Sequence, residues 1–314
     1  MAGCRPMAKR RPPSLAEFLD RFPDDEACED YLAAKRWPDG FVCPACGGVK
    51  GWKLDRDRAT WECAACGRQT SVTAGTVMHR SKVSLHRWFL AAHLMATHSN
   101  GISALQLQAQ LGLGSYKTAW LMCHKLRRAM VDPDRDPLGG IVEIDETSIV
   151  CRTKDEPVAG GQGRSHVGKI LVVGAVELLE DGRPGRARLA RIPDFQAVTL
   201  HRFVGTNVEH GSTVVSDGLQ AYRGLRDVEH ERRVVGGMAA HILMPWIHRV
   251  FSNFKRWALG TLHGLRKKHV DRYLNEFVFR WNRRAHRRAA FDTLLGLATR
   301  LPHASYRNFV QQTV

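Results

Sequence analysis

Two hydrophobic patterns divide this chain. Between residues 84 and 132, apolar residues recur three and four positions apart, as on one face of a helix. From residue 141 onward, apolar residues instead alternate with polar ones or form continuous runs, as in half-buried and fully buried strands. The turn-forming residues of 133–140 separate the two regions. We therefore predict a helical part followed by a strand-rich part, with a domain boundary between them.

Serine residues mark the start of the predicted helices in the first part. Ser84, Ser103 and Ser115 can each cap a helix, and glycines at 101, 112 and 114 end the first two. The third helix has a polar face with four predicted DNA-contacting side chains: Lys117, Lys125, Arg127 and Arg128. A helix, a glycine turn and a basic helix are typical of a helix-turn-helix. Any three-helix scaffold has the same pattern, and that alternative stays open.

The second part has the element order of a ribonuclease H-like fold. Strands are predicted at 141–149, 169–178 and 187–192, then a helix at 195–204, a strand at 213–217, a helix at 219–225, a weak strand near 234 and a long helix from about 246. Three meandering strands followed by alternating helices and strands give a mixed sheet. The predicted class is α/β, preceded by smaller N-terminal elements.

Two aspartates stand out on the predicted strands. Asp145 lies within the first strand, and Asp217 ends the fourth. A carboxylate beside apolar strand residues is costly unless it is paired or binds a metal. A ribonuclease H-like fold holds its metal-binding carboxylates at these two places. The alternative is structural, and for Asp217, which precedes Gly218, it is a cap on the next helix.

Charge suggests the partner. Lys and Arg outnumber Asp and Glu by 47 to 31, which gives a formal net charge of +16. A surplus of this size favours a polyanionic partner, most simply nucleic acid, although a generically basic protein is the alternative. No apolar run is long enough for a membrane span, and residues 1–13 are basic and lack the apolar core of a secretion signal. We expect a disordered basic tail and a cytoplasmic protein that is nucleoid-associated when bound to DNA.

Four cysteines have the spacing of a structural zinc site. Cys43-Pro-Ala-Cys46 and Cys63-Ala-Ala-Cys66 are separated by sixteen residues, and a glycine follows each pair. Four thiolates close the coordination shell of one zinc ion per chain, so the zinc would be structural. In a reducing compartment the pairs favour metal over disulfides. The remaining cysteines, at 4, 28, 123 and 151, are interpreted as ordinary thiols.

These features predict the domain organisation. The basic tail at 1–13 is followed by a helical lead-in and zinc ribbon at 14–80, and by the helix-turn-helix-like segment at 81–132. The ribonuclease H-like catalytic domain spans 140–290, and 291–314 is a C-terminal tail.

The chain resembles a known family over nearly its whole length. The residues that carry the resemblance are Phe22-Pro-Asp-Asp25, Thr73-Ala-Gly-Thr-Val-Met78, Gly101-Ile-Ser-Ala104, Glu143-Ile-Asp-Glu-Thr147, Ser216-Asp-Gly218, Gly260-Thr-Leu-His263 and Arg280-Trp-Asn-Arg-Arg284. In this order they are similar to the zinc-ribbon transposases of the ISXO-like group, in the insertion-sequence family IS-fifteen-ninety-five. The resemblance implies cutting at the element's terminal inverted repeats and joining of those ends to target DNA, with divalent metal.

The resemblance also implies the rest of the active site. Such enzymes usually supply a third carboxylate from the helix after the last strand, but the matching residue here is His248, with Asn253 as a nearby alternative. Lys255 matches the helix lysine of the family, and Arg256 beside it joins the predicted DNA contacts. Asp145, Asp217 and His248 would hold Mg²⁺ or Mn²⁺, with two ions expected. Imidazole suits magnesium less well than a carboxylate does.

The end of the chain supplies a further basic surface. A helix from about Val270 carries Arg280, followed by Arg283 and Arg284, and we predict that these three follow DNA phosphates. Joining two element ends needs at least two active sites, so a homo-oligomer on DNA is expected. The alternatives are a non-catalytic zinc-ribbon DNA-binding protein, a nuclease that cuts without joining, and a domesticated or decayed transposase.

Overall fold

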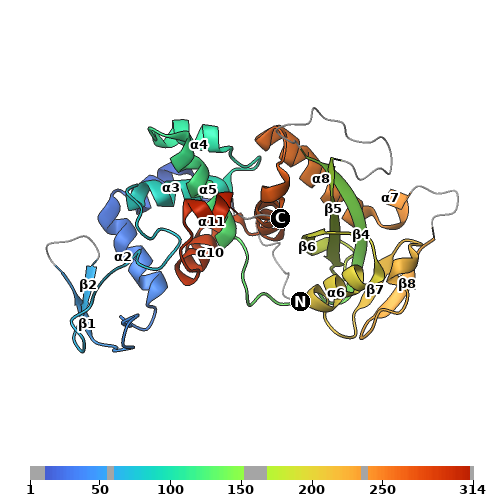
Figure 1. Ribbon diagram of the computed structural model, residues 1–314, viewed down its shortest axis with the longest axis horizontal. Helices are drawn as coiled ribbons and strands as arrows, with labels where there is room; N and C mark the ends of the chain where they lie inside the picture. The colour runs from blue at the N-terminus through green and yellow to red at the C-terminus, as the bar shows by residue number, and fades with distance from the viewer. Residues whose placement is uncertain (1–10, 55–59, 152–167, 235–239, 312–314) are drawn as a thin grey trace, which may run out of the picture. The chain divides into compact units, whose positions relative to one another are not determined.

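A computed structural model describes residues 11–54, 60–151, 168–234 and 240–311 (Figure 1). The chain divides into two compact units. The first consists of residues 1–132 and 283–312, and the second consists essentially of residues 133–282. Most of the predicted basic tail at 1–13 lies outside the described residues. No described helix is long and apolar enough to cross a membrane.

The first unit begins with two capped helices and a small sheet. Helices α1 (Leu15–Arg21) and α2 (Asp25–Arg36) lead into strands β1 (Gly51–Lys53), β2 (Thr60–Cys63) and β3 (Gln69–Ser71). The three strands pair antiparallel in the order β1-β2-β3. A capping box begins α1, because Ser14 accepts from the Glu17 backbone N–H while the Glu17 carboxylate accepts from the Ser14 N–H.

The remaining helices of the first unit are α3 (Leu85–Thr97), α4 (Ala104–Leu111), α5 (Tyr116–Ala129), α10 (Arg287–Arg300) and α11 (Tyr306–Val310). The starts predicted at Ser84, Ser103 and Ser115 are confirmed, since each is the N-cap residue of its helix. Phe291 of α10 packs against Phe18, Phe22 and Phe89 with ring centroids 5.6 to 5.9 Å apart.

Helix α10 spans a predicted domain boundary, which is therefore wrong. The boundary between 290 and 291 falls inside this helix, and Phe291, Leu294 and Leu295 are buried with the N-terminal helices. Helix α10 belongs to the first unit and contacts α2, α3 and α5 there. Its apolar face is removed from water by packing against these three helices. The segment predicted as a C-terminal tail is therefore part of a core over its described residues.

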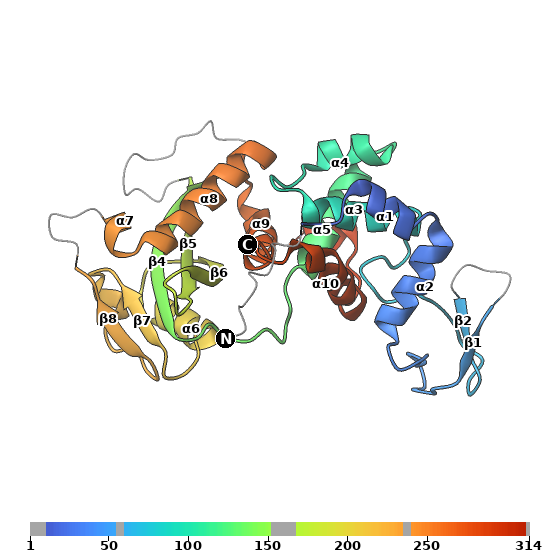
Figure 2. The same ribbon diagram turned by 180° about the vertical axis from the view of Figure 1, so that it is seen from behind.

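The second unit is a five-stranded mixed sheet with helices on both faces (Figures 1 and 2). Its strands are β4 (Ile141–Val150), β5 (Lys169–Leu178), β6 (Pro184–Ile192), β7 (Thr213–Ser216) and β8 (Glu229–Arg232). Its helices are α6 (Ala197–Asn207), α7 (Ala240–Leu243), α8 (Pro245–Leu262) and α9 (Val270–Asn282). Two short 3₁₀ turns are η1 (Gln220–Tyr222) and η2 (Lys267–His269). The predicted helix at 219–225 is only the turn η1, and the strand expected near 234 lies slightly earlier.

Strand order and pairing confirm the ribonuclease H-like class. The order is β6-β5-β4-β7-β8, with β4 antiparallel to β5 and parallel to β7. Side chains alternate between the faces of β4. Val142 and Ile144 pack with α6 and η1 on one face, whereas Ile149 packs with α8 and α9 on the other. The central strand therefore presents one row of side chains to α8.

Candidate functional site

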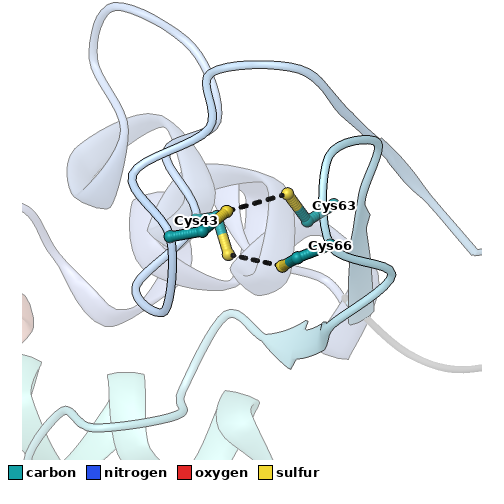
Figure 3. Close-up of side chains that lie close together, drawn as sticks. Cys43, Cys63 and Cys66 are labelled. Atoms are coloured by element: carbon teal, nitrogen blue, oxygen red, sulfur yellow. Dashed lines mark hydrogen bonds between the residues drawn. The ribbon is translucent and has the colours of Figure 1, made fainter.

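The four predicted zinc ligands come together. The sulfur atoms of Cys43, Cys46, Cys63 and Cys66 all lie within 4.8 Å of one another, with Sγ–Sγ distances of 3.7 Å for Cys43–Cys66 and 3.6 Å for Cys46–Cys63 (Figure 3). Each pair is closed by the same turn. The N–H groups of Gly47 and Gly67 donate to the carbonyls of Cys43 and Cys63, and both glycines have positive φ.

The surroundings of this cluster suit thiolate ligands. Backbone N–H groups of Cys46 and Ala45 point to the Cys43 sulfur and lower its pKa, while the other sulfurs raise the pKa of Cys46, since closely placed thiols titrate together. Trp37, Phe41 and Trp61 pack beside the buried cysteines 43 and 63, with the Phe41 and Trp61 rings stacked at 5.5 Å. Four sulfurs with no further ligand position are the donor set of a structural zinc site. These residues fit the zinc that the sequence predicts.

The second site is organised by one row of β4 side chains that face α8. Glu143 accepts hydrogen bonds from the N–H groups of Trp246 and Ile247, both at 2.9 Å, so its carboxylate caps the start of α8. Two residues on, Asp145 Oδ2 lies 3.6 Å from His248 Nδ1. Two residues further, Thr147 Oγ1 accepts from Lys255 Nζ at 2.7 Å. Strand and helix therefore run in the same direction and meet at three successive points.

Gly174 lets α8 approach the sheet at this level. It is the register partner of Asp145 on β5. A Cβ atom there would lie 2.7 Å from the Phe251 ring and 2.9 Å from Ile247 Cδ1, both on α8. An alanine would also come within 2.7 Å of Leu189 on β6, so these side chains would have to shift to make room for it.

Asp217 directly follows β7, the strand that pairs with β4. Strands β4 and β7 pair in parallel from Ile141↔Thr213 to Glu143↔Val215, and Asp217 follows Val215 by two residues as Asp145 follows Glu143. Burial, with a smaller contribution from the charge of Asp217, raises the pKa of Asp145 to about 7 despite the lowering effects of the Glu146 N–H and Lys255. Two carboxylates held this way in a poorly solvated place are stabilised by a cation.

Glu146 belongs to the opposite face, as its alternation with Asp145 predicts. Its carboxylate accepts a hydrogen bond from the hydroxyl of Tyr222, which is fully buried. Burial raises the pKa of Glu146 to about 8, and the charges of Asp145 and Asp217 act in the same direction. Sequence reasoning missed Tyr222, because a tyrosine in a short apolar stretch gives no signal of a polar partner.

The predicted metal ligands are neighbours but do not form a tight cluster. His248 and Lys255 both reach the β4 row, as described above. Asn253, the alternative third ligand, is a half-buried residue of α8. Within the described part of the chain, only the four cysteines place three or more His, Cys, Asp or Glu ligand atoms within 4.8 Å of one another. The roles of Asp145, Asp217 and His248 thus remain predictions.

The structure corrects two of the predicted DNA contacts. Lys125 and Arg127 are 7% and 2% exposed, and the Lys125 ammonium lies over the Trp88 ring. Both side chains point into the first unit because that face of α5 carries the core stripe. Lys117 is exposed, with its ammonium 4.1 Å from the Tyr306 ring centroid, and Arg128 is half-buried and donates to the Pro302 carbonyl.

The C-terminal arginines are less open than the sequence suggested. The Arg280 side chain is 13% exposed, pairs with Glu276 and lies over Trp257. Arg283 and Arg284 are half-buried, and burial lowers the pKa of both. Just before them, Asn282 accepts from the N–H of Ala187 on β6 and donates to the Ala187 carbonyl, which extends the sheet edge with a side chain. Arg256 is exposed on α8.

The fold and the cysteine cluster define the class: a ribonuclease H-like unit in a chain with an N-terminal zinc ribbon. Residues 137–282 match the family described as ISXO2-like transposase domain, and residues 23–69 match the transposase zinc-ribbon domain. A relative from Halobacterium salinarum, described as an uncharacterized protein in transposable element ISH50, is 26% identical over 282 residues, which is 83% of this chain and 92% of the relative. The two matched regions of this chain thus resemble the two domains of ISXO2-like transposases.

Proposed function

We propose that this protein binds the terminal inverted repeats of an insertion sequence, cleaves the DNA there and joins the ends to a target. The observation that carries the proposal is the row Glu143, Asp145 and Thr147 on β4, with Asp217 alongside and α8 opposite. This arrangement lies within the match to the transposase domain. It gathers hard oxygen ligands and a lysine on the face of the sheet that α8 covers.

Asp145, Asp217 and His248 are the proposed ligands of Mg²⁺ or Mn²⁺. These residues fit a metal ion because the like charges of Asp145 and Asp217 repel each other in a poorly solvated site. Two bound ions would activate water or a DNA 3′-hydroxyl and stabilise the leaving oxygen. Because His248 offers nitrogen where a carboxylate is usual, the donor set favours manganese more than an all-carboxylate site would.

The other residues of the row position these ligands and the DNA. Glu143 fixes the first turn of α8 and so sets where His248 lies. Lys255 is exposed and can bind a phosphate next to the scissile one while Thr147 holds its ammonium in place. Arg256, Lys117 and Arg128 are further proposed phosphate contacts, with Arg280, Arg283 and Arg284 through their more limited exposed surface.

The net charge of +16 supports DNA as the partner. Two element ends must be processed together, so we propose that the protein acts as a homo-oligomer assembled on DNA. Asp145 and Asp217 distinguish this proposal from a non-catalytic zinc-ribbon DNA-binding protein, which would have no use for the pair.

The test is cleavage of a labelled duplex that carries the element's own end. Asp145→Ala and Asp217→Ala should each reduce cleavage at least a hundredfold while binding of the same duplex changes little. Asp181→Ala is the matched control, because Asp181 is an exposed acid in the β5–β6 turn whose partner is Arg183. Normal cleavage by either active-site variant would remove that residue from the site. Absence of cleavage by the wild-type protein in both metals would overturn the enzymatic proposal.

A further inference from the structure

A small cavity lies in the second unit where β4 and α8 come to their ends. Its volume is about 270 Å³. Ile149 and Val150 line it from β4, Lys255, Ala258 and Leu259 from α8, and Leu265 from the segment that follows α8. The cavity is only partly enclosed by these residues, and Val150 and Leu259 are 53% and 69% exposed. Apolar side chains thus remain open to solvent around a hollow.

The cavity continues the row of contacts between β4 and α8. Glu143, Asp145 and Thr147 meet the first turn of α8, His248 and Lys255 in turn. The next residue of β4 on that face is Ile149, and the next residues of α8 are Ala258 and Leu259, four residues beyond Lys255 at the farthest. Lys255 belongs both to the lysine contact with Thr147 and to the cavity wall. A ligand held at Asp145 would therefore extend toward this hollow.

The charges around the cavity are positive. Lys255 is the charged side chain among the described lining residues. Lys169 lies close enough to Lys255 to lower its pKa, although burial is the larger cause. Lys267 follows Leu265 by two residues, and its charge reaches Cys151, the residue after Val150. An apolar hollow surrounded by cations suits a nucleotide, whose flat base can contact the apolar side chains while its phosphate is attracted to the cations.

We propose that this cavity takes one unstacked base of the element-end DNA, while Lys255 binds the adjoining phosphate. The inference rests on the proposed function, because it places DNA along the β4–α8 row. The cavity is smaller than the roughly 300–1,000 Å³ of pockets for drug-sized ligands, which suits a single base. Enzymes that expose a base hold it against apolar side chains, and the contact tolerates different bases.

The row also indicates which nucleotide is bound. Residues 148 to 150 lie three to five positions beyond Asp145, or about 10–17 Å along a strand. One strand of B-form DNA advances about 3.4 Å per nucleotide, so the bound base lies roughly three to five nucleotides from the scissile phosphate.

The experiment compares wild type with Leu259→Gln on a series of element-end duplexes. Each duplex lacks one base, at a position from two to six nucleotides on either side of the cleavage site, and equilibrium binding is measured without catalytic metal. At one position the missing base should weaken wild-type binding roughly five- to tenfold. The same missing base should leave Leu259→Gln binding unchanged, because the variant has already lost the apolar rim. Ala258→Leu, which narrows the cavity, should behave like Leu259→Gln.

Leu179→Gln is the matched control, since Leu179 is 46% exposed in the same unit and does not line the cavity. It should respond to missing bases as wild type does. A 2-aminopurine at the identified position should brighten with wild type and not with Leu259→Gln. If every missing base affects Leu259→Gln as much as wild type, the cavity does not hold a base, although the proposed function stands. If wild type binds the element end no better than an unrelated duplex, the proposed function fails and this inference falls with it.

Discussion

His248 is the residue at which this chain departs most from the chemistry that its site calls for. Its Nδ1 atom lies 3.6 Å from Asp145 Oδ2, at the second of three contacts between β4 and α8. A neutral imidazole can share a metal with Asp145, whereas a protonated one can only pair with the carboxylate. The geometry allows either role, and activity in different metals separates them.

We predict that His248→Ala reduces cleavage of the element end at least tenfold in magnesium, with partial recovery in manganese. His248→Glu should stay active and gain relative to wild type in magnesium, because it supplies a hard anionic oxygen. Single-turnover cleavage by the three proteins in each metal is the measurement. Cleavage by the alanine form at the wild-type rate in magnesium would exclude His248 and make Asn253 the next candidate.

His93 gives the first unit a pH-dependent stability. It is 4% exposed, and its ring lies 4.8 Å from the Phe18 ring. Burial lowers its pKa from 6.5 to about 4, with a smaller contribution from the charge of His98. Between pH 6.5 and pH 4, His93 is therefore protonated in the unfolded chain and neutral in the folded chain. Stability from this group is fully present above pH 6.5 and is lost as pH falls toward 4.

The predicted loss for the wild-type protein across this window is about 3 kcal/mol. His93→Phe keeps an aromatic ring beside Phe18 and removes the titrating group, so its melting temperature should fall less between pH 7 and pH 4.5. Both proteins carry the same cysteine cluster, so acid release of zinc contributes equally and cancels in the comparison. If the melting temperatures of the two proteins fall by the same amount between pH 7 and pH 4.5, the assignment to His93 is contradicted.

At the scale of elements, the position of α8 decides the geometry of the site. Helix α8 begins at Pro245, and its N-cap residue, Met244, makes no side-chain hydrogen bond to the first turn. Glu143, which is 1% exposed, provides the cap from the neighbouring strand. A negative charge at a helix N-terminus is favourable, and in a buried setting this exceeds its value on the surface.

We predict that Glu143→Ala lowers the free energy of unfolding by about 2–3 kcal/mol, because two buried N–H groups lose their acceptor. Glu143→Gln should cost less, about 1 kcal/mol, since its one carbonyl oxygen can still accept from both groups. Urea unfolding measures the difference, with Glu180→Ala in the exposed β5–β6 turn as the control. Equal effects of the two Glu143 variants would show that charge, not the shared acceptor, dominates.

The elements themselves were largely predictable, and their partners were not. Helix starts at Ser84 and Ser103 follow from local capping, which depends on residues only three apart. Strand alternation is equally local, and it puts Asp145 and Glu146 on opposite faces of β4. Glu143 capping α8, and Asn282 completing the edge of β6, join residues about a hundred positions apart, and no local pattern encodes them.

Burial explains where the basic residues were misread. Lys125 and Arg127 have the composition of a DNA-reading face, and helical spacing alone does not tell which face of α5 is covered. In the structure, α3 and α10 pack against α5, so the core takes up these two cations. Their long apolar stems make such burial tolerable when the charged ends find partners.

At the scale of the whole molecule, the zinc ribbon is a separate stability problem. Its described sheet has three strands of three or four residues, and the apolar cluster of its described residues consists of Trp37, Phe41, Trp61 and two cysteines. A core this small does not offset the entropy of ordering the segment without metal.

We therefore predict about one zinc per chain by elemental analysis, and loss of that zinc in Cys43→Ser. The variant should expose Trp37 and Trp61 and redshift their emission, while far-UV signals of the second unit persist. Cys28→Ala, outside the cluster, should keep its zinc. Metal-free protein with an unchanged ribbon would overturn the assignment.

The division of the chain has a consequence for its synthesis. The first unit is completed by α10, whose Phe291 packs against Phe18 and Phe22, two residues that are synthesised before the whole second unit. A ribosome must add the 150 residues of 133–282 in between, which takes about 8–30 seconds at roughly 5–20 residues per second. During that interval the nascent N-terminal helices have no partner for their aromatic face, while the second unit can fold once residue 282 has emerged. Chains released before α10 emerges would carry a folded second unit and an N-terminal half with exposed aromatic side chains, which makes them substrates for chaperones and proteases instead of functional fragments.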